Sequence, residues 1–180
     1  GVTVGYNSTR DYSHISFAKG NIFFGNTDTI GTNLTSGNNN FIAGVGAGTS
    51  LTSGRLNNFL VQSAGQRNNT GCNNNFFGQS AGQYNTTGCY NNFLGSNAGF
   101  CNTSGSDNNF FGRNAGFNNT SGCYNNFFGK YTGENNTTGN NNNFFGNCAG
   151  RCGTTSSDNT FIGRNAGRGR LGFCVTGGCN

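Results

Sequence analysis

Aromatic residues along this chain recur with a period of 17 residues. Phe occupies positions 76, 93, 110, 127, 144 and 161, each 17 residues after the previous one. The series extends backward through Phe59, Phe41 and Phe23 at intervals of 17, 18 and 18, so nine copies cover residues 21–167. The clearest copy is residues 74–90, with fixed slots that read Asn, Phe, a second apolar residue, Gly, Ala-Gly and Asn-Thr-Thr-Gly. Such a short internal repeat is typical of a solenoid.

The glycine content of the repeat excludes helices, and its turn chemistry argues against hairpins. Each glycine inside a helix costs about 1 kcal/mol, and most copies carry about three. Two-residue hairpins favour Asn-Gly or Asp-Gly, and neither dipeptide occurs. The pattern therefore predicts an all-β fold: a β-solenoid or β-roll of about nine coils with stacked Phe and Asn ladders and equal slots about 4.8 Å apart.

Two adjacent apolar slots predict an exposed stripe. Neighbours on a strand point to opposite faces, so an inward Phe76 leaves Phe77 outside. Nine such positions would form a stripe about 40 Å long, more apolar surface than soluble monomers usually expose. We expect self-association through it, although a bulge that turns both rings inward or a covering terminal segment would also account for the pattern. The stripe comprises Phe24, Ile42, Leu60, Phe77, Leu94, Phe111, Phe128, Phe145 and Ile162.

Composition and charge exclude several classes of function. The chain is 8% charged and 13% aromatic, whereas disordered chains are rich in charge and poor in aromatics. The basic residues are scattered rather than gathered into the patch that nucleic-acid binding needs, except Arg164, Arg168 and Arg170 near the C-terminus. No apolar run approaches the length of a membrane span. We therefore expect an ordered protein without nucleic-acid partner or membrane span.

The repeat resembles a known family of fibre proteins. Its unit is similar to the Asn-Thr-Ala-Val-Gly-x-x-Ala-Leu-x-x-Asn-Thr-Thr-Gly repeats of surface and tail-fibre proteins in bacteria, algae and their viruses. It is more distantly similar to the β-roll heads of trimeric autotransporter adhesins. The matching slots are Asn74, Gly78, Ala81 and residues 85–88, with equivalents through Asn125, Gly129 and residues 136–139. The resemblance implies a non-enzymatic, often trimeric fibre that functions in attachment. Phe-Phe replaces the family's small residues, which leaves room for a different lateral contact or a helical filament.

Sequons recur along the repeat. Candidate glycosylation sites are Asn7, Asn33, Asn68, Asn85, Asn102, Asn119 and Asn136, with overlapping sequons at Asn118 and Asn135. Glycans on successive coils would lie only about 5 Å apart. The alternative is a ladder of Asn side chains at a corner of the coil, with Thr favouring strand structure. Asn7 lies outside the repeat and escapes the crowding argument.

Eight cysteines favour an oxidising compartment. Cys72 stacks on Cys89 in the coil scheme, within disulfide range, and Cys123 shares their slot; Cys101 and Cys152 share another. Local pairs are also open for Cys148 with Cys152 and for Cys174 with Cys179. Cys-x-x-Cys spacing is absent, so disulfide staples are expected rather than zinc.

Nothing in the sequence indicates catalysis or a cofactor. His14 is the only histidine, and the five acidic residues occupy no common slot with a nearby carboxylate partner. Calcium-binding β-rolls need a regular Asp in a Gly-rich loop, where this repeat has Asn-Thr. We expect no enzyme activity, no metal and no cofactor.

The chain ends differ from the repeat and predict three regions. Residues 1–20 form an N-terminal strand that caps the solenoid or donates an edge strand to a neighbour through Val2, Val4 and Tyr6. Residues 21–167 form the solenoid, and residues 168–180 a disulfide-stapled C-terminal cap. Since the chain opens at Gly1 without Met, we expect that an export signal has been removed.

These patterns favour a secreted structural subunit. We predict an extracellular homo-oligomeric fibre or filament protein on a cell or virion surface, with itself and covalent or bound glycans as partners. One alternative is a glycan-binding adhesin or tail-fibre module with a groove lined by Tyr84, Tyr90, Phe100 and Phe117. A second is an ice-binding solenoid that uses the column of Thr86, Thr103, Thr120 and Thr137.

Overall fold

The computed structural model describes residues 3–5, 14–16, 20–24 and 34–169. This part of the chain contains strands and turns, and no α-helix. The strands are β1 (Thr3–Gly5), β2 (His14–Ser16), β3 (Ile22–Phe24), β4 (Phe41–Ala43), β5 (Asn58–Leu60), β6 (Asn75–Phe77), β7 (Asn92–Leu94), β8 (Asn109–Phe111), β9 (Asn126–Phe128), β10 (Asn143–Phe145) and β11 (Thr160–Ile162).

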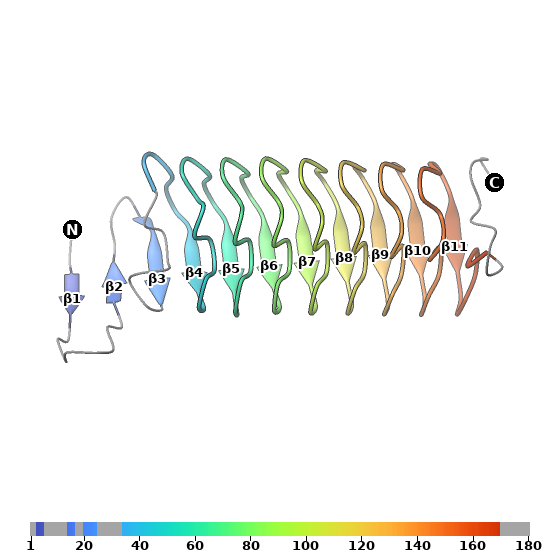
Figure 1. The fold of residues 1–180 in the computed structure, drawn as a ribbon, viewed down its shortest axis with the longest axis horizontal. Coiled ribbons are helices and arrows are strands. Elements are labelled where there is room, and N and C mark those ends of the chain that lie inside the picture. Colours follow the sequence, from blue (N-terminus) through green and yellow to red (C-terminus); the bar gives the residue numbers. More distant parts are fainter. Residues whose placement is uncertain (1–2, 6–13, 17–19, 25–33, 170–180) are drawn as a thin grey trace.

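The predicted β-solenoid is confirmed. Strands β3–β11 form one nine-stranded parallel sheet in chain order, and Figure 1 shows them side by side along the long axis of the molecule. From β4 onward each residue pairs with the residue 17 positions later, as Phe76 does with Phe93. The rest of each coil returns to the sheet through turns. One period of the sequence is therefore one turn of the solenoid.

The strands are short because backbone turns follow on both sides. After β6, Gly78 has φ 151° and Gly82 has φ 56°, conformations that L side chains rarely adopt. A Cβ at Gly82 would also meet the ring of Phe76. The chain thus bends around its own inner ring, which limits each strand to three residues.

The core is a stack of identical side chains. The inner rings of Phe59, Phe76, Phe93, Phe110 and Phe127 are fully buried, and neighbouring rings lie parallel with centroids 4.8–5.0 Å apart. A second buried column consists of Ala47, Ala64, Ala81, Ala98, Ala115 and Ala149, with Thr132 in the same column. Repetition of one well-packed layer lets a chain poor in aliphatic residues build a continuous core.

Two columns of buried asparagines fill the remaining interior. In the column just before the strands, the Asn74 N–H donates to Asn57 Oδ1 at 3.0 Å and Asn74 Nδ2 to the Gly88 carbonyl at 2.8 Å. In the column after the alanines, Asn102 Nδ2 donates to Asn85 Oδ1 at 2.7 Å. Buried amides are costly unless hydrogen-bonded, and here each coil supplies the partners of the next.

The register of the early coils differs from our prediction. Phe41 was expected in the inner Phe column, but Ile42 pairs with Phe59 and is fully buried. Phe41 pairs instead with Asn58. The cause is Asn40, which is bonded to the buried Asn57 and so fixes the second residue after it as the inward one. The intervals at the N-terminal end are therefore 17 and 19 residues, not 18 and 18.

The first two strands lie outside the parallel sheet. β1 pairs with β2 in antiparallel fashion, with Val4 opposite Ile15, and β2 lies next to β3 (Figure 1). The predicted donor strand therefore pairs with its own chain. Val2 and Tyr6 lie outside the described residues, as do Cys174 and Cys179 of the predicted C-terminal cap.

Candidate functional site

The outer face of the sheet carries two parallel ladders. One consists of Asn58, Asn75, Asn92, Asn109, Asn126 and Asn143, in which each Nδ2 donates to the next Oδ1 at 2.7–2.8 Å. The other is the apolar ladder Phe24, Ala43, Leu60, Phe77, Leu94, Phe111, Phe128, Phe145 and Ile162. Eight of the nine predicted outward residues are in it. Ile42 was wrongly placed there and is replaced by Ala43.

The apolar ladder is a regular, half-exposed ridge. Phe111 and Phe128 stack with centroids 4.7 Å apart, and Phe128 and Phe145 with centroids 5.1 Å apart. Phe77 is 37% exposed and Phe145 39%, while Ile162 on the last strand is 74% exposed. Within the described residues, no other part of the chain covers this ridge enough to bury it. The face therefore presents apolar surface that water contacts along most of the solenoid.

Charged residues flank this face and are absent from its two ladders. The residue two positions before each strand belongs to a column that we name the leading rim: Asn39, Leu56, Asn73, Tyr90, Asp107, Tyr124, Asn141 and Asp158. The residue two positions after each strand belongs to the trailing rim: Val45, Gln62, Gln79, Ser96, Arg113, Lys130, Asn147 and Arg164. Sequence reasoning missed the rims and the outer Asn ladder, although the fixed Asn before each Phe pointed to the latter.

Five of the repeat sequons have a buried asparagine, whereas Asn118 and Asn135 are partly exposed. Asn68, Asn85, Asn102 and Asn119 are fully buried and Asn136 is 1% exposed. The Nδ2 that would carry a glycan donates twice in each of the last four: in Asn119 it bonds Asn102 Oδ1 and the Gly122 carbonyl, both at 2.9 Å. These five asparagines therefore form the corner ladder, the alternative to glycosylation that the sequence left open. Asn7 and Asn33 lie outside the described residues.

The cysteines stack as predicted but form hydrogen bonds instead of disulfides. The structure has no disulfide among its described cysteines. The Cys72 N–H donates to Cys89 Sγ at 3.1 Å, and the Cys89 thiol donates to the Thr87 carbonyl at 3.4 Å. One coil further along the same column, the Cys89 N–H donates to Ser106 Oγ at 3.0 Å. The sulfur thus lies over the neighbouring backbone amide, and Cys performs the same role as Ser.

Burial affects two of these thiols. It raises the pKa of Cys89, with a further upward contribution from the charge of the neighbouring Cys72 thiol, and it raises the pKa of Cys101. Both thiols are therefore poorer nucleophiles at neutral pH than a free cysteine.

A further aromatic column lies on another side of the coil. Phe100 and Phe117 stack with centroids 4.9 Å apart, and Tyr84 packs against Phe100 at 5.0 Å. The Arg67 guanidinium lies over the Tyr84 ring, 4.4 Å from its centroid. Ring faces in this column are covered by neighbours along the axis. Tyr90 belongs to the leading rim, so the four residues of the predicted groove do not line one groove.

The Thr column is engaged with the backbone. Thr86 Oγ1 donates to the Thr103 carbonyl at 2.8 Å, and Thr103 Oγ1 to the Thr120 carbonyl at 2.9 Å. Hydroxyls used in this way join successive coils rather than pointing to solvent as a free array.

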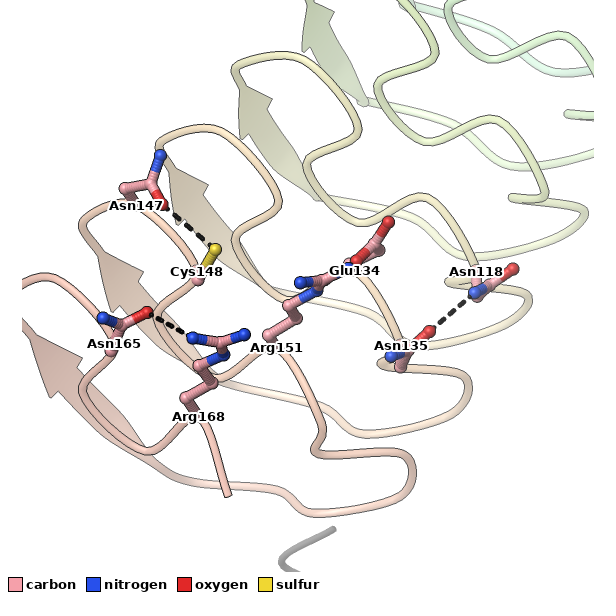
Figure 2. A network of polar contacts seen from close by, with 8 residues as sticks. All are labelled: Asn118, Glu134, Asn135, Asn147, Cys148, Arg151, Asn165 and Arg168. Atoms are coloured by element: carbon pink, nitrogen blue, oxygen red, sulfur yellow. Dashed lines mark hydrogen bonds and ion pairs between the residues drawn. The ribbon is translucent and has the colours of Figure 1, made fainter. Parts of the chain in front are cut away.

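A polar network lies near the last coils (Figure 2). Arg151 Nε donates to Glu134 Oε2 at 2.5 Å, and the hydrogen bond to this carboxylate raises the pKa of the arginine. The Arg151 guanidinium and Lys130 Nζ both lie near the Tyr131 ring, at 5.0 and 4.8 Å from its centroid. Asn118 Nδ2 donates to Asn135 Oδ1 at 2.9 Å. The contacts of Arg151 and of Asn118 tie neighbouring coils together, whereas Lys130 and Tyr131 are adjacent in the chain.

The described residues offer no recognisable reaction centre. They contain no cluster of three His, Cys, Asp or Glu side chains that could hold a metal ion. One hollow is lined by Asn135, Arg151, Cys152, Arg168 and Gly169. Its Arg151 already forms an ion pair with Glu134. The side chain of His14 lies outside what the structure describes. The outer face of the sheet is therefore the strongest candidate site.

Comparisons with known proteins add no further assignment. The chain matches no family model, no curated protein and no solved structure. Among the described residues, no helix has the length and apolar character to cross a membrane.

Proposed function

We propose that this chain is an extracellular structural subunit that associates with itself into a fibre or filament on a cell or virus surface. The observation that carries the proposal is the half-exposed apolar ladder along the outer face. Ladders of identical side chains on a flat sheet are the surfaces that pair in stacked β-structures. Covering this one would remove a row of aromatic and aliphatic side chains from water.

A glycan-binding function ranks second. Sugar rings pack against exposed aromatic faces, whereas the rings of Phe100 and Phe117 lie parallel and cover each other. The same is true of Phe111 and Phe128 on the outer face. Mainly the ring edges remain accessible to a ligand. This supports association between copies of the chain more than it supports the stacking of sugars.

The test is the assembly state of a variant that lacks part of the ladder. Phe111→Ser with Phe128→Ser should abolish association through this face, measured by light scattering and electron microscopy, with β-type circular dichroism unchanged. The matched control is Phe100→Ser with Phe117→Ser, which removes another stacked pair away from the face and should leave assembly intact. Unchanged assembly size in the Phe111/Phe128 variant would refute the role of the ladder.

A further inference from the structure

The two rims of the outer face carry matched residues, coil by coil. Asp107 precedes β8 and Arg113 follows it, and Asp158 and Arg164 flank β11 in the same way. Around β9 the pair is Tyr124 and Lys130. The other described coils are uncharged on both rims, as with Asn73 and Gln79 around β6 or Asn141 and Asn147 around β10. Wherever the leading rim is acidic, the trailing rim of the same coil is basic.

These charges do not neutralise each other within the chain. The two rim residues of one coil are six positions apart, on opposite sides of a three-residue strand, and a fully extended chain of that length would span about 20 Å at most. The ion pair of the described residues is Arg151 with Glu134, which lies elsewhere. Asp158 accepts a hydrogen bond from Asn141 at 3.2 Å, and that donor is neutral. The rim charges are therefore available to a partner.

Only one symmetric pairing brings opposite rims together. When two copies meet face to face about a two-fold axis parallel to the solenoid axis, the leading rim of one copy lies over the trailing rim of the other at the same coil. Asp107 then faces the partner's Arg113, and Asp158 faces the partner's Arg164. When the copies are antiparallel and centred on β7, Asp107 faces the partner's Asn73 and Arg113 the partner's Gln79, and no ion pair forms.

We propose that the outer face binds a second copy of this chain as a parallel, in-register, two-fold pair. This inference rests on the proposed function and names the partner and its orientation. In this arrangement the apolar ladder of each copy lies over the Asn ladder of the other. Both ladders have the same axial repeat on the two copies, so coils match along the full length.

The size and charge of the face fit this occupant. Nine strands at about 4.8 Å and a width of at most about 20 Å give up to about 800 Å² on each copy, which reaches the usual contribution of one partner to a stable interface. The chain carries a formal net charge of +5, so copies repel overall, yet the two ladders that make contact are uncharged. Rim ion pairs act mainly on orientation and partner choice rather than on affinity.

The test uses two charge-reversed variants. At the coils of β8 and β11, Asp107→Arg with Asp158→Arg makes both rims basic, and Arg113→Asp with Arg164→Asp makes both rims acidic. Each variant alone should sediment at about half the mass of the wild-type pair at low ionic strength, where screening is weak. An equimolar mixture should regain the wild-type mass, because every basic rim then faces an acidic one. Leu56, Tyr90 and Tyr124 already occupy the leading-rim conformation, so long side chains fit there.

A matched control separates local pairing from net charge. Arg at Ser36, Thr70, Ser104 and Thr138, all exposed corner positions, adds the same four charges as the basic-rim variant and should leave pairing intact. Pairing by both reversed variants alone, or no pairing in their mixture, would overturn the parallel arrangement. A wild-type chain that forms filaments only one solenoid wide would also overturn it while leaving the fibre function standing. A wild-type chain that stays monomeric under every condition would refute both.

Discussion

At the scale of single residues, a slot of the coil can be defined by the hydrogen bond that its side chain accepts. The column of Cys72, Cys89, Ser106, Cys123 and Asn140 shows this, because each member after the first accepts the N–H of the preceding coil. A thiol sulfur, a hydroxyl oxygen and an amide oxygen can each accept this hydrogen bond. The cysteines therefore need no disulfide to explain their position.

A substitution series at Cys89 tests this account. Cys89→Ser keeps an acceptor for the Cys72 N–H, as Ser106 does for Cys89, and should change the free energy of unfolding by less than about 0.5 kcal/mol. Cys89→Ala leaves that N–H without its partner and should cost about 1 kcal/mol. Denaturant unfolding under reducing conditions measures both. Equal stability of the Ser and Ala variants would contradict the acceptor role.

The raised pKa of Cys89 predicts a pH dependence of stability. Burial keeps the folded thiol protonated above the pKa of the unfolded one, so the folded state binds more protons there. The stabilising contribution is complete below the unfolded pKa, near 9.0, and is lost as pH rises from there through the folded pKa. Melting temperatures measured from pH 7 to 10 should fall less steeply in Cys89→Ser. A slope unchanged by this substitution would assign the effect to other groups.

At the scale of elements, one coil is stable only through its neighbours. Each inner ring is sandwiched between two others, as Phe93 is between Phe76 and Phe110 at 4.9 and 4.8 Å. A three-residue strand has little stability alone. Contacts between coils therefore supply most of the stability, and damage to one layer affects the two beside it.

Removal of a central ring should be severe. Phe93→Ala opens a cavity between two buried rings and should destabilise the fold by about 3–5 kcal/mol. Phe111→Ala, on the half-exposed outer ladder of the adjacent coil, should cost the isolated subunit less than half as much. Thermal unfolding of both variants checks the difference. Similar losses would mean that the outer ladder is as well packed as the inner one.

The glycine that ends the Asn corner in most coils is required by close approach between coils. A Cβ at Gly122 would meet the Gly139 carbonyl oxygen, whereas a Cβ at Gly153 would find no atom nearer than 3.8 Å. Gly122→Ala should therefore cost about 1–3 kcal/mol through overpacking, and Gly153→Ala should be close to neutral. Chemical denaturation compares the pair. A neutral Gly122→Ala would show that the coils separate easily at this corner.

At the scale of the whole molecule, the ends and the lateral face have different consequences for assembly. A two-fold contact through the face closes into a pair, whereas growth of a filament needs a contact that repeats along the axis. The β1–β2 pair lies at the β3 end of the sheet (Figure 1). An exposed strand edge at that end would be a site for further strand addition.

Deletion of residues 1–19 should therefore promote association along the axis. The deletion removes β1 and β2 and so takes away the strand in contact with β3, the terminal strand of the nine-stranded sheet. Particle length in electron micrographs should therefore increase at fixed protein concentration. Shorter particles, or none, would instead identify the N-terminal segment as the element that joins subunits, as the donor-strand prediction had it. Circular dichroism of the deleted chain verifies that the solenoid is retained.

The sequence by itself determined the period, the solenoid and most of the outer ladder. Coils that stack in register put every seventeenth residue into the same environment, so a repeated Phe-Phe already separates an inner from an outer column. The same logic predicted that Cys72 lies next to Cys89, and the structure confirms this position.

Only the tertiary structure decided what depends on contacts between columns. Phe41 and Ile42 are both apolar, and the buried amide of Asn40 rather than either side chain selects Ile42 as the inward residue. A sequon such as that of Asn119 has the same letters whether its amide is buried or exposed. By spacing alone, the thiols of Cys72 and Cys89 lie within reach of a disulfide. In the structure, the Cys72 N–H instead donates a hydrogen bond to Cys89 Sγ. A sequence repeat specifies which residues share a column, whereas burial and hydrogen-bond partners follow from how the columns pack around the coil.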